Sequence, residues 1–284
     1  MNIRSYLSFI KFSHTLFAMP FAIVGFFMAT GVFHYDFNPY ILLYVLLCMV
    51  FARNAAMAFN RWADHEWDAG NERTARREIP AGIIKPKNAL IFIVVNSLGF
   101  IVTTFFINSL CFYLSPIALM VILGYSYTKR FTYLSHFVLG VGLGLAPIGA
   151  FLALSGEFKV LPVFLSVAVW AWVSGFDILY SIQDISFDKD HKLFSVPAKF
   201  GIVRSLWISR SMHILSALFI IGIAIYANTG VYYLMGAFVF ISLLFYQHTV
   251  VRNGKLDRIN FAFFNLNGIA SVIFALFAVI EFLN

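Results

Sequence analysis

The sequence predicts an all-α integral membrane protein with nine transmembrane helices, and two observations carry this prediction. First, 61% of the 284 residues are hydrophobic and only 12% are charged, whereas soluble domains are about 45–50% apolar and about 25% charged. Second, apolar runs long enough to cross roughly 30 Å of hydrocarbon, about 17–25 residues each, recur along the whole chain. We therefore expect membrane lipid to surround the protein.

Nine such runs are separated by short polar turns. They are 12–33, 40–60, 88–108, 111–128, 132–153, 161–182, 206–227, 231–250 and 260–282. The first run follows Arg4 but is too long for the apolar region of a cleaved signal peptide, so we expect it to stay as the first helix. No soluble domain or low-complexity segment interrupts the runs. We therefore expect a single transmembrane domain over residues 1–284.

The basic residues predict the orientation of the chain. If the N-terminus and every second connection lie on one side, 19 of the 20 Lys and Arg residues share that side and only Lys159 lies opposite. Cytoplasmic loops carry an excess of Lys and Arg, so we expect a cytoplasmic N-terminus. The net charge of +7 does not indicate a nucleic-acid partner, because the basic residues are scattered between apolar runs and form no basic face.

The acidic residues are concentrated in two places. Nine of the 13 are Asp64, Glu66, Asp68, Glu72 and Glu78 after the second run, and Asp177, Asp184, Asp188 and Asp190 at the end of the sixth. Both groups fall on the predicted cytoplasmic side. An Asp inside a span costs roughly 2.5–3.5 kcal/mol on insertion scales, so acids at membrane depth indicate a functional site.

The spacing of these acids predicts a metal site. Asn60, Asp64 and Asp68 are four residues apart and would share one face of a continuing helix. The second group has positions i, i+3, i+7 and i+11 on one face, with Gln183 adjacent, and consists of Asp177, Tyr180, Asp184 and Asp188. Mg²⁺ prefers a few carboxylates together with substrate phosphate. We therefore expect the two faces to share Mg²⁺.

Basic residues lie next to the acids in the sequence. Arg73, Arg76 and Arg77 follow the first group, and Lys129 with Arg130 follows the fourth run. Arginine forks match phosphate oxygens and lysine acts as a point charge, so these residues suit a bound diphosphate. The basic character of cytoplasmic loops is the competing explanation for each of them.

Two segments carry a family resemblance. Residues 53–82, RNAAMAFNRWADHEWDAGNERTARREIPAG, resemble the first signature of the UbiA superfamily of membrane aromatic prenyltransferases, N-R-x-x-D-x-x-x-D followed by R-T-x-x-R. Residues 175–201, GFDILYSIQDISFDKDHKLFSVPAKFG, resemble the second, D-x-x-Y-x-x-Q-D-x-x-x-D. The chain departs from many relatives at Glu72 and Glu78, where they have Pro. These departures concern the choice of acceptor, since no proposed ligand is altered.

The resemblance implies nine helices around a central cavity and a cytoplasmic active site. It implies transfer of an isoprenoid chain from an allylic prenyl diphosphate to an aromatic acid such as 4-hydroxybenzoate or a hydroxynaphthoate, in quinone biosynthesis in a bacterial inner membrane. The residues implied to hold Mg²⁺ are Asn60, Asp64, Asp68, Asp177, Asp184 and Asp188, of which Asp64, Asp68, Asp184 and Asp188 are also implied to act in catalysis. Those implied to contact diphosphate are Asn60, Arg73, Arg77, Lys129 and Gln183. Lys129 is also counted among the catalytic residues.

Further roles follow from this chemistry. Tyr125, Tyr127 and Tyr180 are candidates to shield an allylic cation by their ring faces. The candidates to receive the acceptor carboxylate are Arg53, an intramembrane arginine seven residues before Asn60, and more weakly Lys11 and His14. The segments 69–86 and 185–200 are expected to close over the site as lids.

Two alternatives remain at this point. A cation-coupled transporter would also place carboxylates within helices, although its acids would lie near the midplane rather than at one membrane face. Within the family, a transferase that adds a tail to a haem or chlorophyll would share the donor chemistry. Magnesium-dependent release of diphosphate on adding donor and acceptor would distinguish an enzyme from a transporter.

Overall fold

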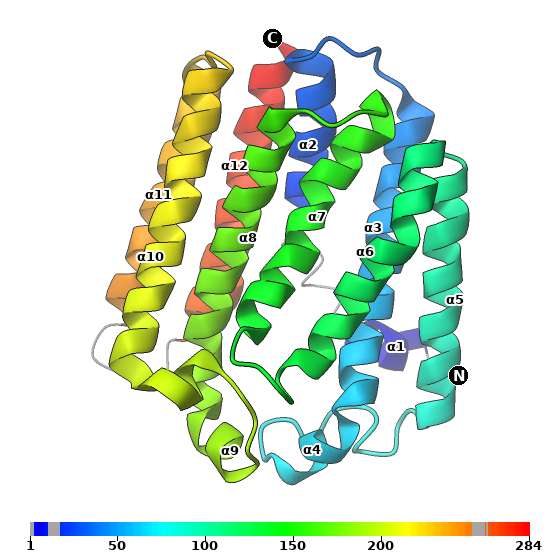
Figure 1. Cartoon of the computed structure of the whole chain (residues 1–284), viewed down its shortest axis with the longest axis vertical. Helices are drawn as coiled ribbons and strands as arrows, with labels where there is room; N and C mark the ends of the chain where they lie inside the picture. The colour runs from blue at the N-terminus through cyan, green and yellow to red at the C-terminus, as the bar shows by residue number, and fades with distance from the viewer. Residues whose placement is uncertain (1–2, 11–17, 252–258, 260) are drawn as a thin grey trace.

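The computed structural model describes residues 3–10, 18–251, 259 and 261–284, and every regular element within these ranges is helical (Figure 1). The elements are α1 (Ile3–Phe9), α2 (Met19–Gly31), α3 (Pro39–Ala63), α4 (His65–Gly70), α5 (Pro86–Phe105), α6 (Ser109–Thr128), α7 (Ser135–Ser155), α8 (Val160–Ser181), η2 (Ile182–Asp184), α9 (Ile185–Asp190), α10 (Val196–Tyr226), α11 (Val231–Val250), η5 (Phe261–Leu266) and α12 (Asn267–Leu283).

Eight of the described helices are long and apolar enough to cross a membrane. The all-helical membrane class is therefore confirmed. The first predicted span contains α2, which has 13 residues, and residues 11–17 of that span lie outside the described ranges. The count of nine spans and the side of the N-terminus stay predictions.

Helix starts follow local capping chemistry. The Asn38 side chain accepts hydrogen bonds from two backbone N–H groups at the start of α3, and Asn108 accepts one at the start of α6. Ser195 caps α10 in the same way, with a proline in the first turn. The predicted span 206–227 falls almost wholly within α10, which begins earlier, at Val196, and bends at Gly201, whose φ of 76° is non-helical.

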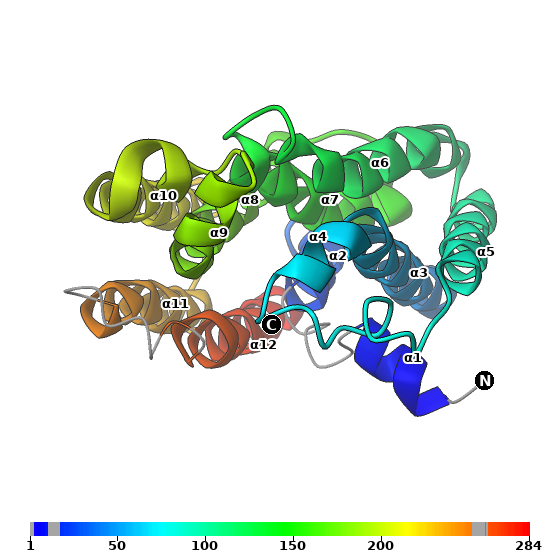
Figure 2. The ribbon, with the colours of Figure 1, turned by 90° about the horizontal axis from the view of Figure 1, so that it is seen from below.

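One half of the bundle is densely packed. Helices α2, α8, α10, α11 and α12 enclose a core of aromatic side chains around Trp172, which is fully buried. Phe21, Phe240 and Phe176 all have ring centroids within 5.8 Å of the Trp172 ring. In Figure 2, seen along the helices, this half lies opposite α3 and α5.

The other half is looser because α3, α6 and α7 surround a cavity. Helices α2 and α7 approach closely at Gly25, where a Cβ atom would lie 2.1 Å from the carbonyl oxygen of Pro147. Any larger residue there would separate the two helices. The contact between α2 and α7 joins the packed half of the bundle to the half that contains the cavity.

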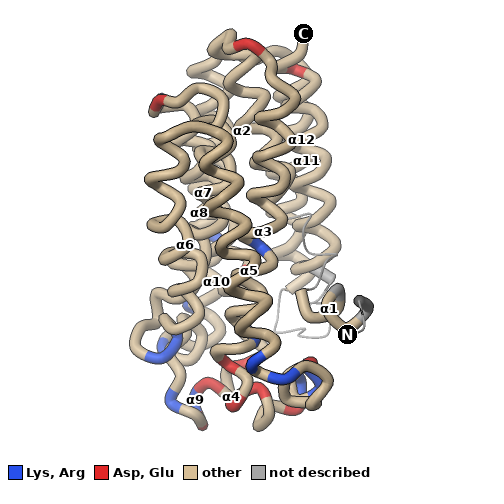
Figure 3. Tube along the Cα trace, turned by 90° about the vertical axis from the view of Figure 1, so that its right-hand side faces the viewer, with Lys and Arg blue, Asp and Glu red and all other residues tan. Residues whose placement is uncertain are grey.

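Charged residues gather at one end of the molecule, around α4 and α9 (Figure 3). The C-terminus lies at the opposite end, and α1, which the sequence did not predict, lies toward the charged end (Figures 1 and 3). The two acidic segments are thus next to each other in space, although the first ends at Glu78 and the second begins at Asp177.

Candidate active site

Both acidic segments have the same local structure. Helix α3 ends at Ala63, Asp64 takes φ −102° and ψ 9°, and the six-residue α4 carries Asp68. Helix α8 ends at Ser181, one 3-10 turn ends at Asp184 with φ −99° and ψ 6°, and the six-residue α9 carries Asp188. The expected continuing helices are therefore broken at the first aspartate of each pair.

The acids still lie together despite the breaks. The hydrogen bonds from Asp64 N to Asn60 O and from Asp68 N to Asp64 O keep the helical spacing through the first break. A polar cavity of about 210 Å³ is lined from both segments. Its lining includes Asn60, Asp64, Asp68, Arg73, Arg77, Tyr125, Lys129, Arg130, Asp177, Tyr180, Asp184 and Asp188.

Each of the four motif carboxylates faces a cation. The pairs are Asp68 with Arg77 at 2.7 Å, Asp184 with Arg73 at 2.9 Å, Asp64 with Arg130 at 3.5 Å and Asp188 with Lys129 at 3.7 Å. Arg73 reaches both oxygens of Asp184 through Nε and Nη2, which is the bidentate geometry of a strong pair. Arg130, which the sequence analysis grouped with Lys129 as suited to a bound diphosphate, thus pairs with Asp64 in the site.

Burial changes the acidity of Asp64. Desolvation, and then the nearby Asp68 carboxylate, raise the pKa of Asp64 to about 6, although Arg130 and Lys129 oppose the shift. Because a negative charge is costly at this position, a cation that binds here stabilises the carboxylate by more free energy than it would stabilise an exposed carboxylate.

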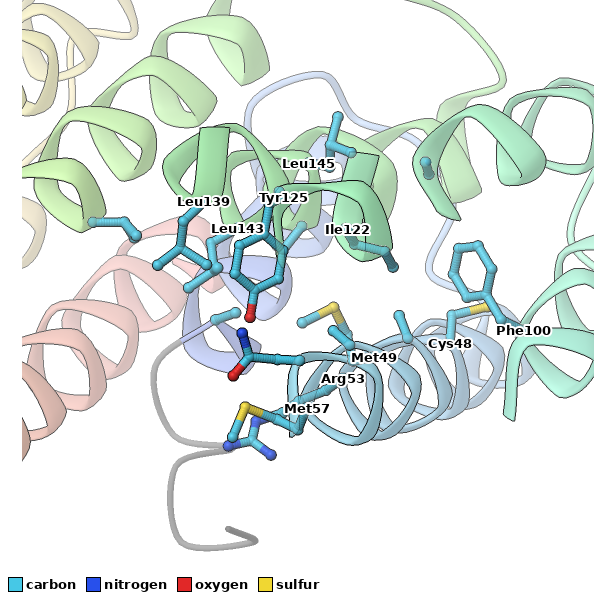
Figure 4. Close-up of a pocket in the computed structure, with 18 of the residues that line it drawn as sticks. Cys48, Met49, Arg53, Met57, Phe100, Ile122, Tyr125, Leu139, Leu143 and Leu145 are labelled. Atoms are coloured by element: carbon cyan, nitrogen blue, oxygen red, sulfur yellow. The ribbon is translucent and has the colours of Figure 1, made fainter. Parts of the chain in front are cut away.

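The second cavity is larger and mostly apolar, with a volume of about 720 Å³. It runs between α3, α6 and α7, where Met49 from α3 lies on the side of Leu139 and Leu143 from α7 (Figure 4). On α3 its lining extends from Arg61 back to Val45, a stretch of about 24 Å at helical rise. Such a space fits an elongated apolar ligand.

The two cavities meet. The residues that line both are Asn60, Arg73, Arg77, Tyr125, Leu139, Asp177 and Tyr180. Tyr125 points into the space above α3 in Figure 4. The junction therefore combines carboxylate, guanidinium and aromatic groups, with a polar space on one side and an apolar space on the other.

Of the three candidates to bind the acceptor carboxylate, the structure describes one. Arg53 lines the apolar cavity on α3, and its Nη1 donates a hydrogen bond to the carbonyl oxygen of Ile10 at 2.9 Å. Lys11 and His14 lie outside the described residues.

Two other candidates line neither of these cavities. The Tyr127 ring packs on Phe59 and lies 4.3 Å from the Arg130 guanidinium carbon, so Tyr127 supports Arg130. The Gln183 Nε2 is buried without a hydrogen-bond partner among the described residues. The sequence grouped both with the site because they lie next to motif residues, and their roles stay predictions.

A histidine that sequence reasoning missed contacts the site. The His136 Nδ1 lies 2.6 Å from Oδ2 of Asp177, and its Nε2 accepts the backbone N–H of Val196 at 3.3 Å. Since Nε2 accepts, Nδ1 carries the proton and donates it to the carboxylate. His136 therefore orients Asp177 and ties α7 to the first turn of α10. No motif marks it, because tertiary packing alone brings it there.

The donor set fits Mg²⁺ bound together with a phosphate. Among the described residues no three His, Cys, Asp or Glu side chains converge on one point as they stand. However, Oδ2 of Asp188 is buried without a hydrogen-bond partner in that same part of the chain, and Asp188 is 1% exposed. Oxygen ligands from a few carboxylates, completed by substrate oxygens, are what Mg²⁺ requires.

Comparisons with known proteins agree with this geometry. The model of the UbiA prenyltransferase family matches residues 18–269. A 4-hydroxybenzoate octaprenyltransferase of Aliivibrio salmonicida (strain LFI1238) is 30% identical over 241 residues, which cover 83% of this chain and 82% of that protein. One from Aliivibrio fischeri (strain MJ11) is 29% identical over 236 residues, with coverages of 83% and 82%.

Solved structures share the fold. The apo structure of a UbiA homologue from Aeropyrum pernix K1 has a TM-score of 0.86 and 30% identity, covering 94% of this chain and 98% of that one. A UbiA homologue from Archaeoglobus fulgidus, bound to DMAPP and Mg²⁺, has a TM-score of 0.76 at 17% identity, covering 98% and 99%. With the two motifs lining one cavity and the family model spanning most of the sequence, the chain is a multi-pass membrane enzyme that belongs to the UbiA prenyltransferase family.

Proposed function

We propose that this enzyme transfers an isoprenoid chain from an allylic prenyl diphosphate to a ring carbon of an aromatic acceptor, such as 4-hydroxybenzoate or a hydroxynaphthoate, in quinone biosynthesis. One observation supports this most: a polar cavity rich in cations and carboxylates opens into an apolar cavity. A molecule with a diphosphate head and an apolar tail matches both spaces at once. The family assignment, to an enzyme of this class, speaks against a transporter.

The head group is assigned to the polar cavity. Arg73, Arg77 and Lys129 are the cations that would bind diphosphate oxygens. Mg²⁺ would be held by oxygen ligands drawn from Asn60, Asp64, Asp68, Asp177, Asp184 and Asp188. When bound, Mg²⁺ supplies Lewis-acid stabilisation of the leaving diphosphate. The carboxylates now paired with Arg73 and Arg77 would then release these arginines to the substrate.

The reaction takes place at the junction of the cavities. The C1–O bond of the donor breaks, and its electron pair leaves with the diphosphate, whose charge Arg73 and Lys129 neutralise. The allylic cation forms a bond to an electron-rich ring carbon, and that carbon loses its proton to solvent to restore aromaticity. Tyr125 and Tyr180, which line both cavities, would shield the cation by their ring faces.

Arg53 is the proposed partner of the acceptor carboxylate. It lines the apolar cavity within α3, where an arginine favours an anionic ligand. We expect Arg53→Ala to raise the KM for a carboxylated acceptor about tenfold or more, because a charge-assisted hydrogen bond is lost. The KM for the prenyl donor should stay unchanged. Equal losses for both substrates would make Arg53 a structural residue.

The active site is proposed to face the cytoplasm, in a bacterial inner membrane. The gathering of Lys and Arg around the polar cavity supports this orientation, and the curated relatives are bacterial. Labelling of a cysteine introduced at Lys189 by an impermeant reagent in intact cells tests it. Modification without lysis would place this end outside.

One assay tests the function. Purified enzyme is incubated with Mg²⁺, a short prenyl diphosphate and a panel of hydroxylated benzoates and naphthoates, with haem and chlorophyll precursors as the alternative acceptors, and products are identified by mass. We expect one aromatic acid to gain the prenyl mass with release of one diphosphate. Diphosphate release or prenylation that is unchanged by chelation of Mg²⁺ would contradict the metal role. A prenylated porphyrin would show that the acceptor is a haem or chlorophyll precursor instead of an aromatic acid.

A further inference from the structure

Two stacked aromatic side chains lie at the junction of the two cavities, on the side formed by α8 and η5. The rings of Tyr180 and Phe263 are stacked, with centroids 4.1 Å apart and planes at 30°, and Phe176 packs edge-on to Phe263 at 5.2 Å. All three residues line the apolar cavity, and Tyr180 also lines the polar one. Phe263 thus extends the aromatic surface of Tyr180 into the apolar space.

The Tyr180 end of this pair is attached to the proposed diphosphate site. Arg73 Nη1 donates to the Tyr180 hydroxyl at 3.3 Å, and the guanidinium carbon lies 5.6 Å from the ring centroid. The same arginine binds both oxygens of Asp184. The pair therefore begins where the C1–O bond of the donor would break and continues along the first part of the tail.

The Phe263 end is held by a buried amide. Phe263 belongs to η5, a π-helical turn, and such turns occur frequently at functional sites. The Asn267 Nδ2 donates to the Phe263 carbonyl oxygen at 3.0 Å, while its Oδ1 accepts from Trp172 Nε1 at 2.8 Å and Gln247 Nε2 at 2.7 Å. Asn267 is fully buried, so it joins the π turn to α8 and α11 through hydrogen bonds shielded from water.

We propose that Phe263 is a further substrate-facing residue, which with Tyr180 forms a wall that shields the allylic cation from water, and that Asn267 is the positioning residue of this wall. The inference rests on the proposed function. Without the wall, water attacks C1: the C1–O bond to diphosphate has broken with its electron pair on the leaving group, the water oxygen bonds to C1, and one water proton passes to solvent. The product is then prenyl alcohol instead of the prenylated acceptor.

A purely structural Phe263 predicts something else. If Phe263 only packs against Phe176, its truncation lowers thermal stability and total turnover but leaves the division between alcohol and prenylated product unchanged. The ratio of these two products is therefore the readout, because loss of folded enzyme scales both equally.

The variant is Phe263→Leu, with Phe277→Leu as its matched control. Phe277 lies on α12 facing Gly236 of α11 and lines neither cavity. Both variants are assayed as full-length enzyme with Mg²⁺, a short prenyl diphosphate and the acceptor used by the wild type. We expect the alcohol-to-product ratio to rise about three- to tenfold in Phe263→Leu, the range of a lost cation–π contact, and to stay at the wild-type value in Phe277→Leu and in the conservative Phe263→Tyr.

The positioning role is tested by Asn267→Ala against Asn96→Ala. Asn96 is also buried and donates to a carbonyl four residues earlier, that of Phe92, but it lies on α5 and lines neither cavity. We expect only Asn267→Ala to raise the ratio. An unchanged ratio in Phe263→Leu, with wild-type enzyme turning over normally, would overturn the wall while leaving the proposed function intact. Absence of any prenylated product from the wild type would instead overturn the proposed function.

Discussion

The two acidic motifs of this enzyme follow one structural plan but obtain their cations differently. In each, a long apolar helix breaks at an aspartate and a six-residue helix carries a second aspartate four residues on. In the first motif Asp68 pairs with Arg77 from the loop that follows it. In the second, Asp184 pairs with Arg73 from the first motif's loop, and Asp188 pairs with Lys129 after α6.

This difference assigns distinct tasks to the motifs. The second motif supplies carboxylates, while the first supplies carboxylates and also the arginine that reaches across to Asp184. Arg73 therefore couples the two halves of the site, whereas Arg77 acts within one half. Binding of a metal and a diphosphate would exchange these carboxylate–cation pairs for carboxylate–metal and cation–phosphate pairs, with little net change in charge.

The largest expected effect comes from removing one carboxylate of either motif. We expect Asp64→Asn and Asp184→Asn each to lower kcat by about 10²–10³-fold or more, because each removes, without changing side-chain size much, a carboxylate charge that would hold the Mg²⁺ needed to stabilise the departing diphosphate. Turnover and thermal unfolding in detergent are measured together. The fold should be retained, since the asparagine keeps one hydrogen-bonding oxygen. Normal Mg²⁺-dependent turnover in both variants would remove the two-motif site.

The next largest effect is expected at Arg73, the arginine that couples the two motifs. Arg73→Lys keeps the charge but loses the forked contact to Asp184 and the hydroxyl of Tyr180. We expect it to lower kcat/KM for the prenyl donor about tenfold or more, the cost of charged hydrogen bonds. Arg77→Lys is the matched control, since Arg77 uses a single nitrogen, Nη1, toward Asp68. A smaller loss in Arg73→Lys than in Arg77→Lys would contradict the coupling role.

The sequence was enough to predict the fold class and the residues of the two motifs, because both depend on residues that are close together in the chain. Apolar run length and i, i+4 spacing depend on neighbours in the chain, so Asn60, Asp64 and Asp68 could be grouped without a structure. The breaks at Asp64 and Asp184 were missed because no Gly or Pro marks them. The early start of α10 had a signal in Ser195 and Pro197, a capping serine before a proline.

The remaining site residues depend on packing between helices. Arg130 reaches Asp64 from the end of α6, and His136 reaches Asp177 from α7. Neither distance follows from sequence spacing, since each pair is at least 41 residues apart. Phe263 lines the apolar cavity from a π turn, which the sequence analysis did not predict. Such contacts require the relative placement of helices, which the sequence pattern does not contain.

A further prediction concerns the loops after each motif, the 69–86 and 185–200 segments. We expect both to gain protection from hydrogen exchange when Mg²⁺ and a non-ionisable prenyl diphosphate analogue bind, because anion binding relieves repulsion among Arg73, Arg76 and Arg77 and between other loop cations. Closure would keep water from the allylic cation. Exchange in the loop between α10 and α11 serves as the control. Unchanged protection in both segments at saturating ligand would contradict the lids.

The smallest effect is expected at the glycines where these loops end. Gly82 has φ 72° and Gly201 has φ 76°, and a Cβ at either would meet no atom within 4 Å. The cost of a side chain there is therefore backbone strain, not a clash. Gly124 has the same open surroundings but lies within helix α6 without a positive φ. It is the matched control.

We expect Gly201→Ala to lower the free energy of unfolding by about 1–3 kcal/mol, because its φ 76° and ψ 171° lie in a region that only glycine occupies readily. Gly82→Ala should cost about 1–2 kcal/mol, the penalty for a left-handed residue. Gly124→Ala should leave stability unchanged or raise it by up to about 1 kcal/mol. Thermal and denaturant unfolding in detergent measure all three. If Gly201→Ala is as stable as Gly124→Ala, the bend in α10 is free to straighten, and the second motif's loop has no fixed hinge to set it beside the first.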